Sequence, residues 1–313
     1  MFPSRSRVLR GNAFLVVALA RAFARRATLV AALCLALFIA TSAHATVTAT
    51  DDVGRTVTLP RSPQKIVSIA PGATEMLFAA GAGNRVIATV EFSDEPVAAK
   101  AIPRIGDANA IDMERVVALR PDLVVVWEGG NNVAQVAQLE RLGIPLYRQK
   151  VEKLSDLPAS LRRLGDLAGT RAVADKAATD VAARIAQLEG RYVGKERPTV
   201  LLEVWNRPIY TVGGTHMMSD SLRLCGARNV FGDLKELGPT VDAEAVIGRD
   251  PDVIVAVAPP GVARGWLDEW KRFGTLRAVR NERLIPFEDS RLSRLGPSTV
   301  GGTEALCKAI HGR

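Results

Sequence analysis

The sequence predicts an α/β fold in which two Rossmann-like lobes, each built on a parallel sheet, are joined by one long helix. Three observations predict it. After residue 46, apolar strand patterns and helical patterns alternate, which is typical of parallel sheets covered by helices. A 16-residue unit, Ile111–Val126, recurs as Val241–Ala256 with six identical positions. Between the two copies lies an alanine-rich segment with helical spacing.

The first 45 residues have the composition of a leader that is removed on export. They contain six arginines and no acidic residue, and an apolar run from Leu29 to Ala40 precedes the small-residue pattern Ala43-His44-Ala45. This run is shorter than the roughly 20 residues of a membrane helix. We therefore expect residues 1–45 to be a cleaved signal peptide and the mature protein to be periplasmic. The alternative is an uncleaved membrane anchor.

The leader also accounts for most of the net charge. The chain carries 41 basic and 33 acidic residues, a formal net charge of +8, and removing the six leader arginines leaves 35 basic residues. No basic stripe interleaved with aromatic residues remains, so the composition gives no indication of nucleic-acid binding. We expect a monomer with two lobes, each large enough for its own core.

The N-terminal lobe is expected to span residues 46–154. It begins with a β-hairpin, because Val47–Leu59 alternates around a turn at Asp52–Gly54. Strands and helices should then alternate. The strands are predicted at Ile66–Ala70, Val86–Val90, Leu123–Trp127 and Ile144–Tyr147, and the helices at Thr74–Ala80, Asp112–Leu119 and Val133–Leu142.

Residues 155–194 are expected to form the linking helix. Ala174, Ala177, Val181, Ile185 and Leu188 follow spacings of three and four, which places them on one helix face. A glycine, at position 165 or 169, is expected to break this helix.

The C-terminal lobe, residues 195–313, repeats the alternation. Strands are predicted at Thr199–Val204, Ile209–Val212, Val253–Val257 and Arg283–Phe287, and helices at Asp242–Ile247, Trp266–Phe273 and Thr299–Ile310. One more helix should follow Gly213 and Gly214 and continue through Leu224. Ligands of open parallel sheets bind at the carboxyl ends of the strands. Two such lobes facing each other would form a ligand-binding cleft. It should be lined by the loops Ala70–Thr74, Glu91–Asp94, Trp127–Asn131, Trp205–Tyr210 and Phe287–Arg294.

Six motifs in a fixed order carry a family resemblance. They are VSIAPGATEMLFAAGAG at Val67, FSDEP at Phe92, IDMERVVALRPDLVVVWEGGN at Ile111, the helix after Asp156, CGARNVF at Cys225 and the PS…LC ending from Pro297 to Cys307. Together they resemble the periplasmic substrate-binding proteins of ABC importers for metal chelates, with the corrinoid branch the most similar. The resemblance implies a helical-backbone, class III fold with little hinge motion. It also implies capture of a cobalamin-like ligand, or alternatively haem or a ferric siderophore, for an inner-membrane permease.

The resemblance further implies the residues that contact the ligand. Phe92, Trp127, Trp205 and Tyr210 match aromatic positions that stack on a flat macrocycle, since such a ring is held by rigid aromatic walls. Arg291, together with Arg294, is expected either to bind an anionic edge of the ligand or to be solvated. Trp266 and Trp270, four apart on a helix, are expected to pack in the core or on the helix face.

Permease docking is expected to use one acid on each lobe. The resemblance makes Glu75 of the PGATE motif an exposed docking acid, and the alternative is an ordinary first-turn acid favoured by the helix dipole. Asp220 lies six residues before Gly226, as Glu75 lies six before Gly81. We take Asp220 as the counterpart of Glu75 in the second lobe.

The remaining chemistry-bearing residues are few. Outside the leader, Cys225 and Cys307 are the only cysteines, and in an oxidising compartment they form either a disulfide or two buried free thiols. His216 is the only histidine between the leader and the last three residues, so a zinc set is not available. No nucleophile-elbow, phosphate-loop or dinucleotide motif occurs. We expect no catalytic residue, no metal site and no cofactor.

Overall fold

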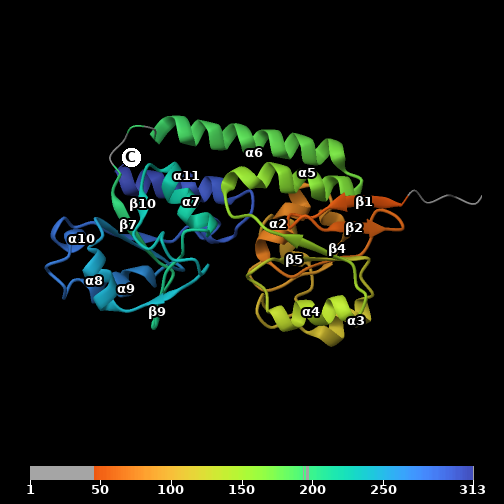
Figure 1. Ribbon diagram of the computed structural model, residues 1–313, viewed down its shortest axis with the longest axis horizontal. Helices are drawn as coiled ribbons and strands as arrows, with labels where there is room; N and C mark the ends of the chain where they lie inside the picture. The colour runs from red at the N-terminus through yellow and green to blue at the C-terminus, as the bar shows by residue number, and fades with distance from the viewer. Residues whose placement is uncertain (1–45, 193, 195–196, 313) are drawn as a thin grey trace, which may run out of the picture. The chain divides into compact units, whose positions relative to one another are not determined.

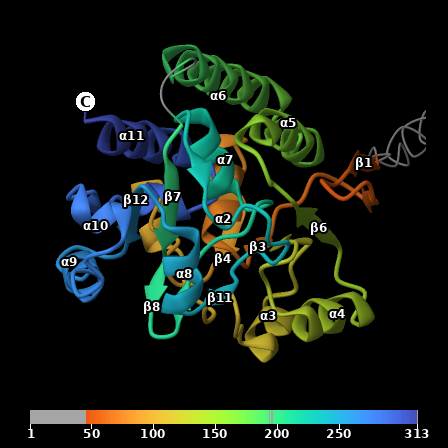
Figure 2. The same cartoon turned by 60° about the vertical axis from the view of Figure 1, so that its left-hand side comes forward.

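The computed structural model describes residues 46–192, 194 and 197–312, and the predicted leader, residues 1–45, lies outside them. The described chain is α/β and contains a four-stranded parallel sheet in each lobe. Figure 1 shows helix α6 (Arg171–Tyr192) lying along both lobes, and in Figure 2 helices α5 (Leu157–Ala168) and α6 again share one side of the two sheets. The predicted fold class, two parallel-sheet lobes joined by a helical segment, is confirmed.

The N-terminal lobe has the strand order β4-β3-β5-β6, and all neighbours are parallel. A β-hairpin of β1 and β2 precedes this sheet. The elements are β1 (Val47–Thr50), β2 (Thr56–Leu59), β3 (Ile66–Ser68), α2 (Pro71–Ala79), β4 (Val86–Ala88), α3 (Met113–Leu119), β5 (Leu123–Trp127), α4 (Val133–Arg141) and β6 (Leu146–Gln149), with short 3-10 turns at Gly83–Arg85, Val97–Ala101 and Leu154–Asp156.

Alternation along β3 and β5 directs their side chains to two different cores. Ile66, Leu123 and Val125 join the cluster that contains α2 and α5. Val67 and Val124 face the opposite way and join the cluster that contains α3 and α4. Both faces of this sheet are therefore buried, as the continuous apolar runs predict.

The C-terminal lobe repeats this arrangement with the order β10-β7-β12-β13. Three short strands, β11-β9-β8, form a separate antiparallel sheet. The elements are β7 (Thr199–Glu203), β8 (Trp205–Asn206), β9 (Ile209–Tyr210), α7 (Met217–Leu224), β10 (Arg228–Asn229), β11 (Thr240–Val241), α8 (Ala243–Arg249), β12 (Val253–Val257), α9 (Ala263–Trp270), α10 (Arg277–Arg280), β13 (Leu284–Phe287) and α11 (Thr299–His311), with a 3-10 turn at Ser290–Ser293.

The repeated sequence unit folds the same way in both lobes. Asp112 and Asp242 cap α3 and α8 by accepting a backbone N–H three residues further on, at 3.0 and 2.7 Å. Asp122 accepts two backbone N–H bonds from the segment just before β3, and Asp252 accepts the N–H of Thr199 at the start of β7. Identical residues therefore fasten the central strand of each sheet to its neighbour.

The linking segment consists of two helices. Gly169, with a left-handed φ of +68°, ends α5, and α6 begins at Arg171. The break predicted at a glycine thus lies at Gly169. Gly165 has a different function, because a Cβ there would clash with the Cβ of Ala174 on α6. It lets the two helices approach closely.

Helix α6 belongs to the packed core. Its buried residues are Ala174, Ala178, Val181, Ile185, Leu188 and Tyr192, so the predicted face is confirmed except that Ala178 is buried and Ala177 is half-buried. They join one apolar cluster with residues of both sheets. This shared core connects the two lobes through side-chain packing.

A few element boundaries differ from the prediction. Helix α2 begins at Pro71 and not at Thr74, because proline is accommodated in the first turn of a helix. Helix α9 begins at Ala263, three residues before the predicted start at Trp266. The short elements α10, β10 and β11 were not predicted, since two to four residues carry no periodic signal.

Candidate functional site

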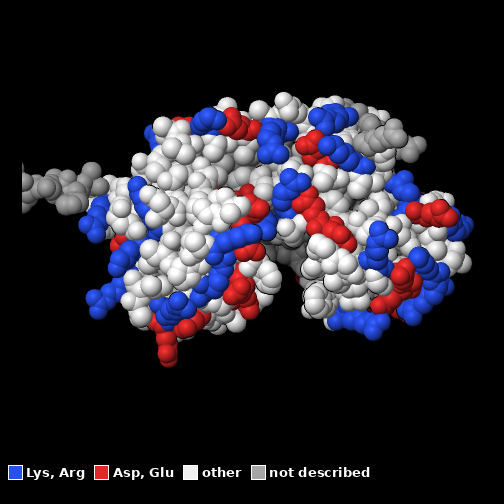
Figure 3. Space-filling model, turned by 180° about the vertical axis from the view of Figure 1, so that it is seen from behind, with Lys and Arg blue, Asp and Glu red and all other residues white. Residues whose placement is uncertain are grey.

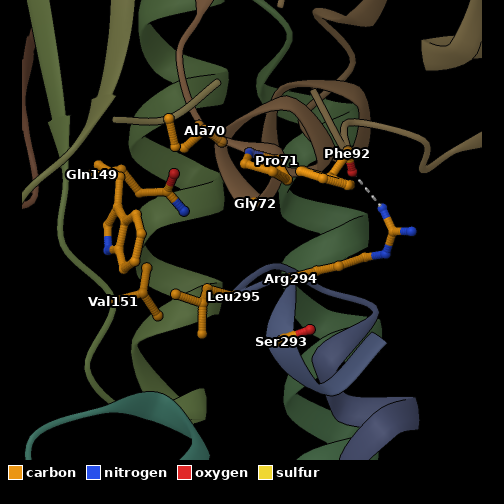
Figure 4. A pocket seen from close by; sticks show the side chains of 12 residues that line it. Ala70, Pro71, Gly72, Phe92, Gln149, Val151, Ser293, Arg294 and Leu295 are labelled. Atoms are coloured by element: carbon orange, nitrogen blue, oxygen red, sulfur yellow. Dashed lines mark hydrogen bonds between the residues drawn. The ribbon is translucent and has the colours of Figure 1, made fainter. Parts of the chain in front are cut away.

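A cavity of about 290 Å³ lies where strands β3, β5 and β6 end. Figure 4 shows it in close-up, with residues of the N-terminal lobe on one side and Ser293, Arg294 and Leu295 of the C-terminal lobe on the other. Its lining is mostly apolar and consists of Ala70, Pro71, Gly72, Ala73, Phe92, Ala108, Trp127, Gln149, Val151, Ser293, Arg294 and Leu295. The first cavity is therefore formed by both lobes.

A second cavity of about 430 Å³ lies where β12 and β13 of the other sheet end. It shares Pro71, Phe92, Ser293 and Arg294 with the first cavity. Its other lining residues are Asp94, Val257, Ala258, Pro259, Pro260, Phe287, Glu288, Asp289 and Ser290. The carboxyl ends of the two sheets thus meet at adjoining cavities, the position where open parallel sheets bind ligands.

Trp127 forms one wall of the first cavity, and its loop holds it firmly. Asn131 Oδ1 accepts the N–H of Trp127 at 2.6 Å, and Asn131 Nδ2 donates to the carbonyl oxygens of Ile69 and Ala108 at 2.8 and 2.7 Å. The indole lies directly over Gly130, where any Cβ would clash with it. One buried amide therefore ties together three segments around the cavity.

Phe92 stands between the two cavities and is 75% exposed. Its backbone has a φ of +64°, a strained conformation for a bulky residue. A buried hydroxyl chain restrains the loop: Thr89 Oγ1 donates to Ser93 Oγ at 2.9 Å and lies 2.6 Å from Thr74 Oγ1. The first turn of α2 and the Phe92 loop are thereby locked together.

Arg294 connects the two lobes at the same place. Its Nη1 donates to the carbonyl oxygen of Phe92 at 3.1 Å, as Figure 4 shows. Within the described part of the chain, its buried Nε has no hydrogen-bond partner. Leu295 beside it has a φ of +59°, a second strained residue in the cavity wall.

Trp205 and Tyr210 do not line either cavity. They lie in the hairpin β8–β9, which is anchored to α9: the Trp205 ring meets the edge of Trp266 at 5.9 Å, and Arg207 Nη2 bonds Glu269 Oε1 at 2.8 Å. The predicted cleft loops therefore all contribute to the cavities except Trp205–Tyr210.

Arg291 is also absent from both linings. Its guanidinium binds the carboxylate of Asp289 at 2.5 to 3.1 Å, and these bonds hold the pKa of that carboxyl below its usual range. The same side chain lies close to Gly301 on α11. Of the two arginines considered from the sequence, Arg294 is the one that lines the cavities.

The two predicted docking acids are buried, so the expectation that they are exposed is wrong. Glu75 is 8% exposed and accepts hydrogen bonds from the backbone and the hydroxyl of Ser298, and burial raises its pKa. Asp220 is 7% exposed, accepting the Leu154 N–H at 2.9 Å and Arg223 Nε at 2.7 Å. Both carboxylates are engaged inside the molecule in this conformation.

The two cysteines outside the leader lie together. Cys225, which ends α7, and Cys307, inside α11, have sulfur atoms 2.05 Å apart.

Trp266 and Trp270 are both buried, as expected from their spacing of four residues on one helix.

The surface charges and the candidate metal-ligating side chains of the described residues do not indicate a nucleic-acid or metal site. Figure 3 shows basic and acidic side chains interspersed over one face of the molecule. No group of three His, Cys, Asp or Glu side chains suited to a metal ion occurs among the residues that the structure describes. Within the same residues, no helix has the length and apolar character of a membrane span.

Two α/β lobes with cavities at the carboxyl ends of both sheets form an architecture suited to binding a ligand between the lobes. The family model described as periplasmic binding protein matches residues 66–286. The chain belongs to this family of binding proteins. It is a carrier of a ligand and not an enzyme that works with a cofactor.

Curated relatives and solved structures agree with this assignment. The chain is 30% identical to the vitamin B12-binding protein of Vibrio parahaemolyticus, over 80% of this chain and 91% of the relative. It is 35% identical to that of Pectobacterium atrosepticum, over 79% and 88%. The crystal structure of the periplasmic vitamin B12 binding protein BtuF of Vibrio cholerae matches with a TM-score of 0.74 and 29% identity, over 80% of this chain and 97% of BtuF.

A haem-binding structure is similar to a lesser degree. The periplasmic haem-binding protein from Pseudomonas aeruginosa matches with a TM-score of 0.70 and 25% identity, over 80% of this chain and 93% of that protein.

Proposed function

We propose that the protein is the substrate-binding component of an ABC importer that captures a corrinoid such as cobalamin between its lobes and delivers it to a membrane permease. The observation that carries this proposal is the similarity to proteins named vitamin B12-binding, over about four fifths of the chain. The apolar cavity between the lobes supports it, because large ligands with an apolar face are bound in such concave sites.

Phe92 and Trp127 are the aromatic residues that we assign to the ligand. Both line the first cavity, and the loops that carry them are restrained by buried hydrogen bonds. Arg294 lines both cavities and places a cationic side chain where a polar group at the ligand edge would lie. We assign no ligand contact to Trp205, Tyr210 or Arg291, which lie outside both linings.

Haem is the second candidate, because a haem-binding protein shares the fold. Haem iron is usually held by a His, Cys, Met or Tyr side chain. In the described part of the chain, none of these residue types lines either cavity. This observation favours a corrinoid over haem.

Equilibrium dialysis of the purified protein against cyanocobalamin, haemin and a ferric siderophore tests the proposal. We expect cyanocobalamin to be retained at a one-to-one ratio, with its visible absorption band, and the other two to be retained more weakly. Retention of haemin in preference to cyanocobalamin would replace the corrinoid by haem.

We also propose the cellular setting. Residues 1–45 would be removed as a signal peptide, the mature monomer would act in the periplasm, and Cys225 and Cys307 would form a disulfide there. The loaded protein would dock on the permease in the inner membrane. Glu75 and Asp220 would take part in docking only if their internal bonds opened.

A further inference from the structure

The two lobes touch at the wall of the first cavity, where Gly72, Arg294 and Leu295 are lining residues. The first turn of α2 packs against the segment Arg294–Ser298, which precedes α11. A Cβ at Gly72 would clash with the carbonyl oxygens of Arg294 and Leu295. The absence of a side chain at Gly72 therefore allows the two lobes to meet backbone to backbone.

Glu75 extends this contact one helical turn further along α2. Its Oε2 accepts the Ser298 hydroxyl at 2.8 Å, and its Oε1 accepts the Ser298 backbone N–H. Ser298 precedes the 13-residue helix α11, so a carboxylate of the N-terminal lobe caps a helix of the C-terminal lobe. A Cβ at Gly296 would lie only 2.9 Å from Oε2, so a glycine there leaves room for the carboxylate.

The segment held by this cap is also a wall of the cavity. Arg294 and Leu295 line the first cavity and lie only four and three residues before Ser298. Leu295 has a strained left-handed backbone, which persists only where the surroundings restrain it. The bonds from Glu75 to Ser298 restrain one end of this segment, and the bond from Arg294 to Phe92 restrains the other.

We propose that Glu75 is a positioning residue, which holds the Arg294–Ser298 segment of one lobe against α2 of the other and so sets the geometry of the cavity wall. Glu75 acts through Ser298 and does not line the cavity itself. The consequence for ligand affinity rests on the proposed function, whereas the contact between the lobes does not.

Hydrogen exchange without ligand tests the contact itself. In Glu75→Ala the amides of residues 294–300 should exchange faster than in the wild type, by about tenfold or more, because the cap of α11 is lost. Glu75→Gln keeps an acceptor and should show a smaller increase. Glu304→Ala is the matched control, since Glu304 is an acid on α11 that pairs with Arg191 and Lys308 and not with the N-terminal lobe among the described residues. Unchanged exchange in both Glu75 variants would overturn the proposal.

Ligand kinetics test the positioning role. With cyanocobalamin as probe, Glu75→Ala should bind with a faster off-rate and a Kd raised by about tenfold, because the wall is no longer preorganised. Ser298→Ala removes the hydroxyl bond to Glu75 and should weaken binding in the wild type, but it should add little in the Glu75→Ala background, where that bond is already lost. Additive effects, or an unchanged Kd in a folded Glu75→Ala protein, would reject the role. A third outcome separates the two proposals. If the Glu75 variants exchange faster but the wild type binds no cyanocobalamin, the contact between the lobes stands and the corrinoid ligand is rejected.

Discussion

At the scale of single residues, Trp127 is the side chain whose removal should affect ligand binding most directly. It presents its indole to the cavity, and its backbone N–H donates to Asn131 Oδ1 at 2.6 Å. Trp127→Ala should therefore weaken cyanocobalamin binding by about 1 to 3 kcal/mol, the usual range for a stacked anchor. Titration of the wild type and the variant by tryptophan fluorescence measures this difference.

Trp205→Ala is the matched control for this prediction. Trp205 is 55% exposed and lies outside both cavities, so its removal should leave the Kd for cyanocobalamin unchanged. If Trp205→Ala weakened binding as much as Trp127→Ala, the ligand would have to extend to the β8–β9 hairpin.

His216 makes stability depend on pH. Its Nδ1 accepts the Met218 N–H at the start of α7, and burial lowers the pKa of the imidazole to about 4. Between pH 6.5 and 4 the unfolded state binds more protons than the folded state, so this contribution to the free energy of unfolding is full above pH 6.5 and is lost as the pH falls. His216→Asn keeps a good cap and removes the titration.

Urea unfolding at pH 7 and pH 4.5 checks this prediction. The free energy of unfolding should drop more for the wild type than for His216→Asn over that interval. An equal drop in the two proteins would show that His216 does not titrate differently in the folded and unfolded states.

At the scale of elements, Glu203 joins the end of β7 to α9. Trp270 Nε1 donates to its Oε2 at 2.8 Å, and burial, with Glu269 nearby, raises its pKa to about 7. The folded state then keeps a proton between pH 4.5 and 7 that the unfolded state releases, so the contribution is greatest below pH 4.5 and is lost as the pH rises to 7. The contribution of Glu203 to the free energy of unfolding therefore falls as the pH rises, whereas that of His216 rises with pH.

Glu203→Gln isolates the effect, because the amide still accepts from Trp270 and does not ionise. Above pH 7 the variant should be more stable than the wild type by about 1 to 3 kcal/mol, and below pH 4.5 the difference should vanish. Thermal or urea unfolding across this range measures it. A constant difference at all pH values would contradict the raised pKa.

The pair Cys225 and Cys307 connects α7 to α11 across a separation of 82 residues. If the pair is a disulfide in the exported protein, it should stabilise the folded state by about 4 kcal/mol, because the cross-link lowers the conformational entropy of the unfolded chain. Thiol titration of the denatured, unreduced protein should find no free thiol. Two free thiols per chain would leave only a close contact between reduced cysteines.

The limits of prediction from sequence follow from the range of the interactions. Buried strands, the two repeated helices and a helix break at Gly165 or Gly169 depend on residues a few positions apart, and local patterns predicted them. Glu75 is buried by Ser298, 223 residues away in the sequence, and no local pattern signals that contact.

The candidate site shows the same limit. Phe92 follows β4, Trp127 ends β5, and both were found from the motifs that surround them. Gln149 and Val151 were missed because the predicted strand stopped at Tyr147, two residues before the end of β6. Trp205 was expected to line the cleft and lies outside both cavities, and its hairpin is held by α9 through a contact between distant segments.

At the scale of the whole molecule, a ligand bound by residues of both lobes should stabilise the folded chain as one unit. Both lobes line the first cavity, and one apolar cluster runs through both sheets and α6. Cyanocobalamin at 100 times its Kd should raise the free energy of unfolding by about 2.7 kcal/mol. Urea unfolding followed by circular dichroism and by tryptophan fluorescence should show one coincident transition at a higher midpoint. Haemin at the same concentration should raise the free energy of unfolding less than cyanocobalamin does. Two separate transitions, with only one shifted by cyanocobalamin, would mean that a single lobe binds the ligand.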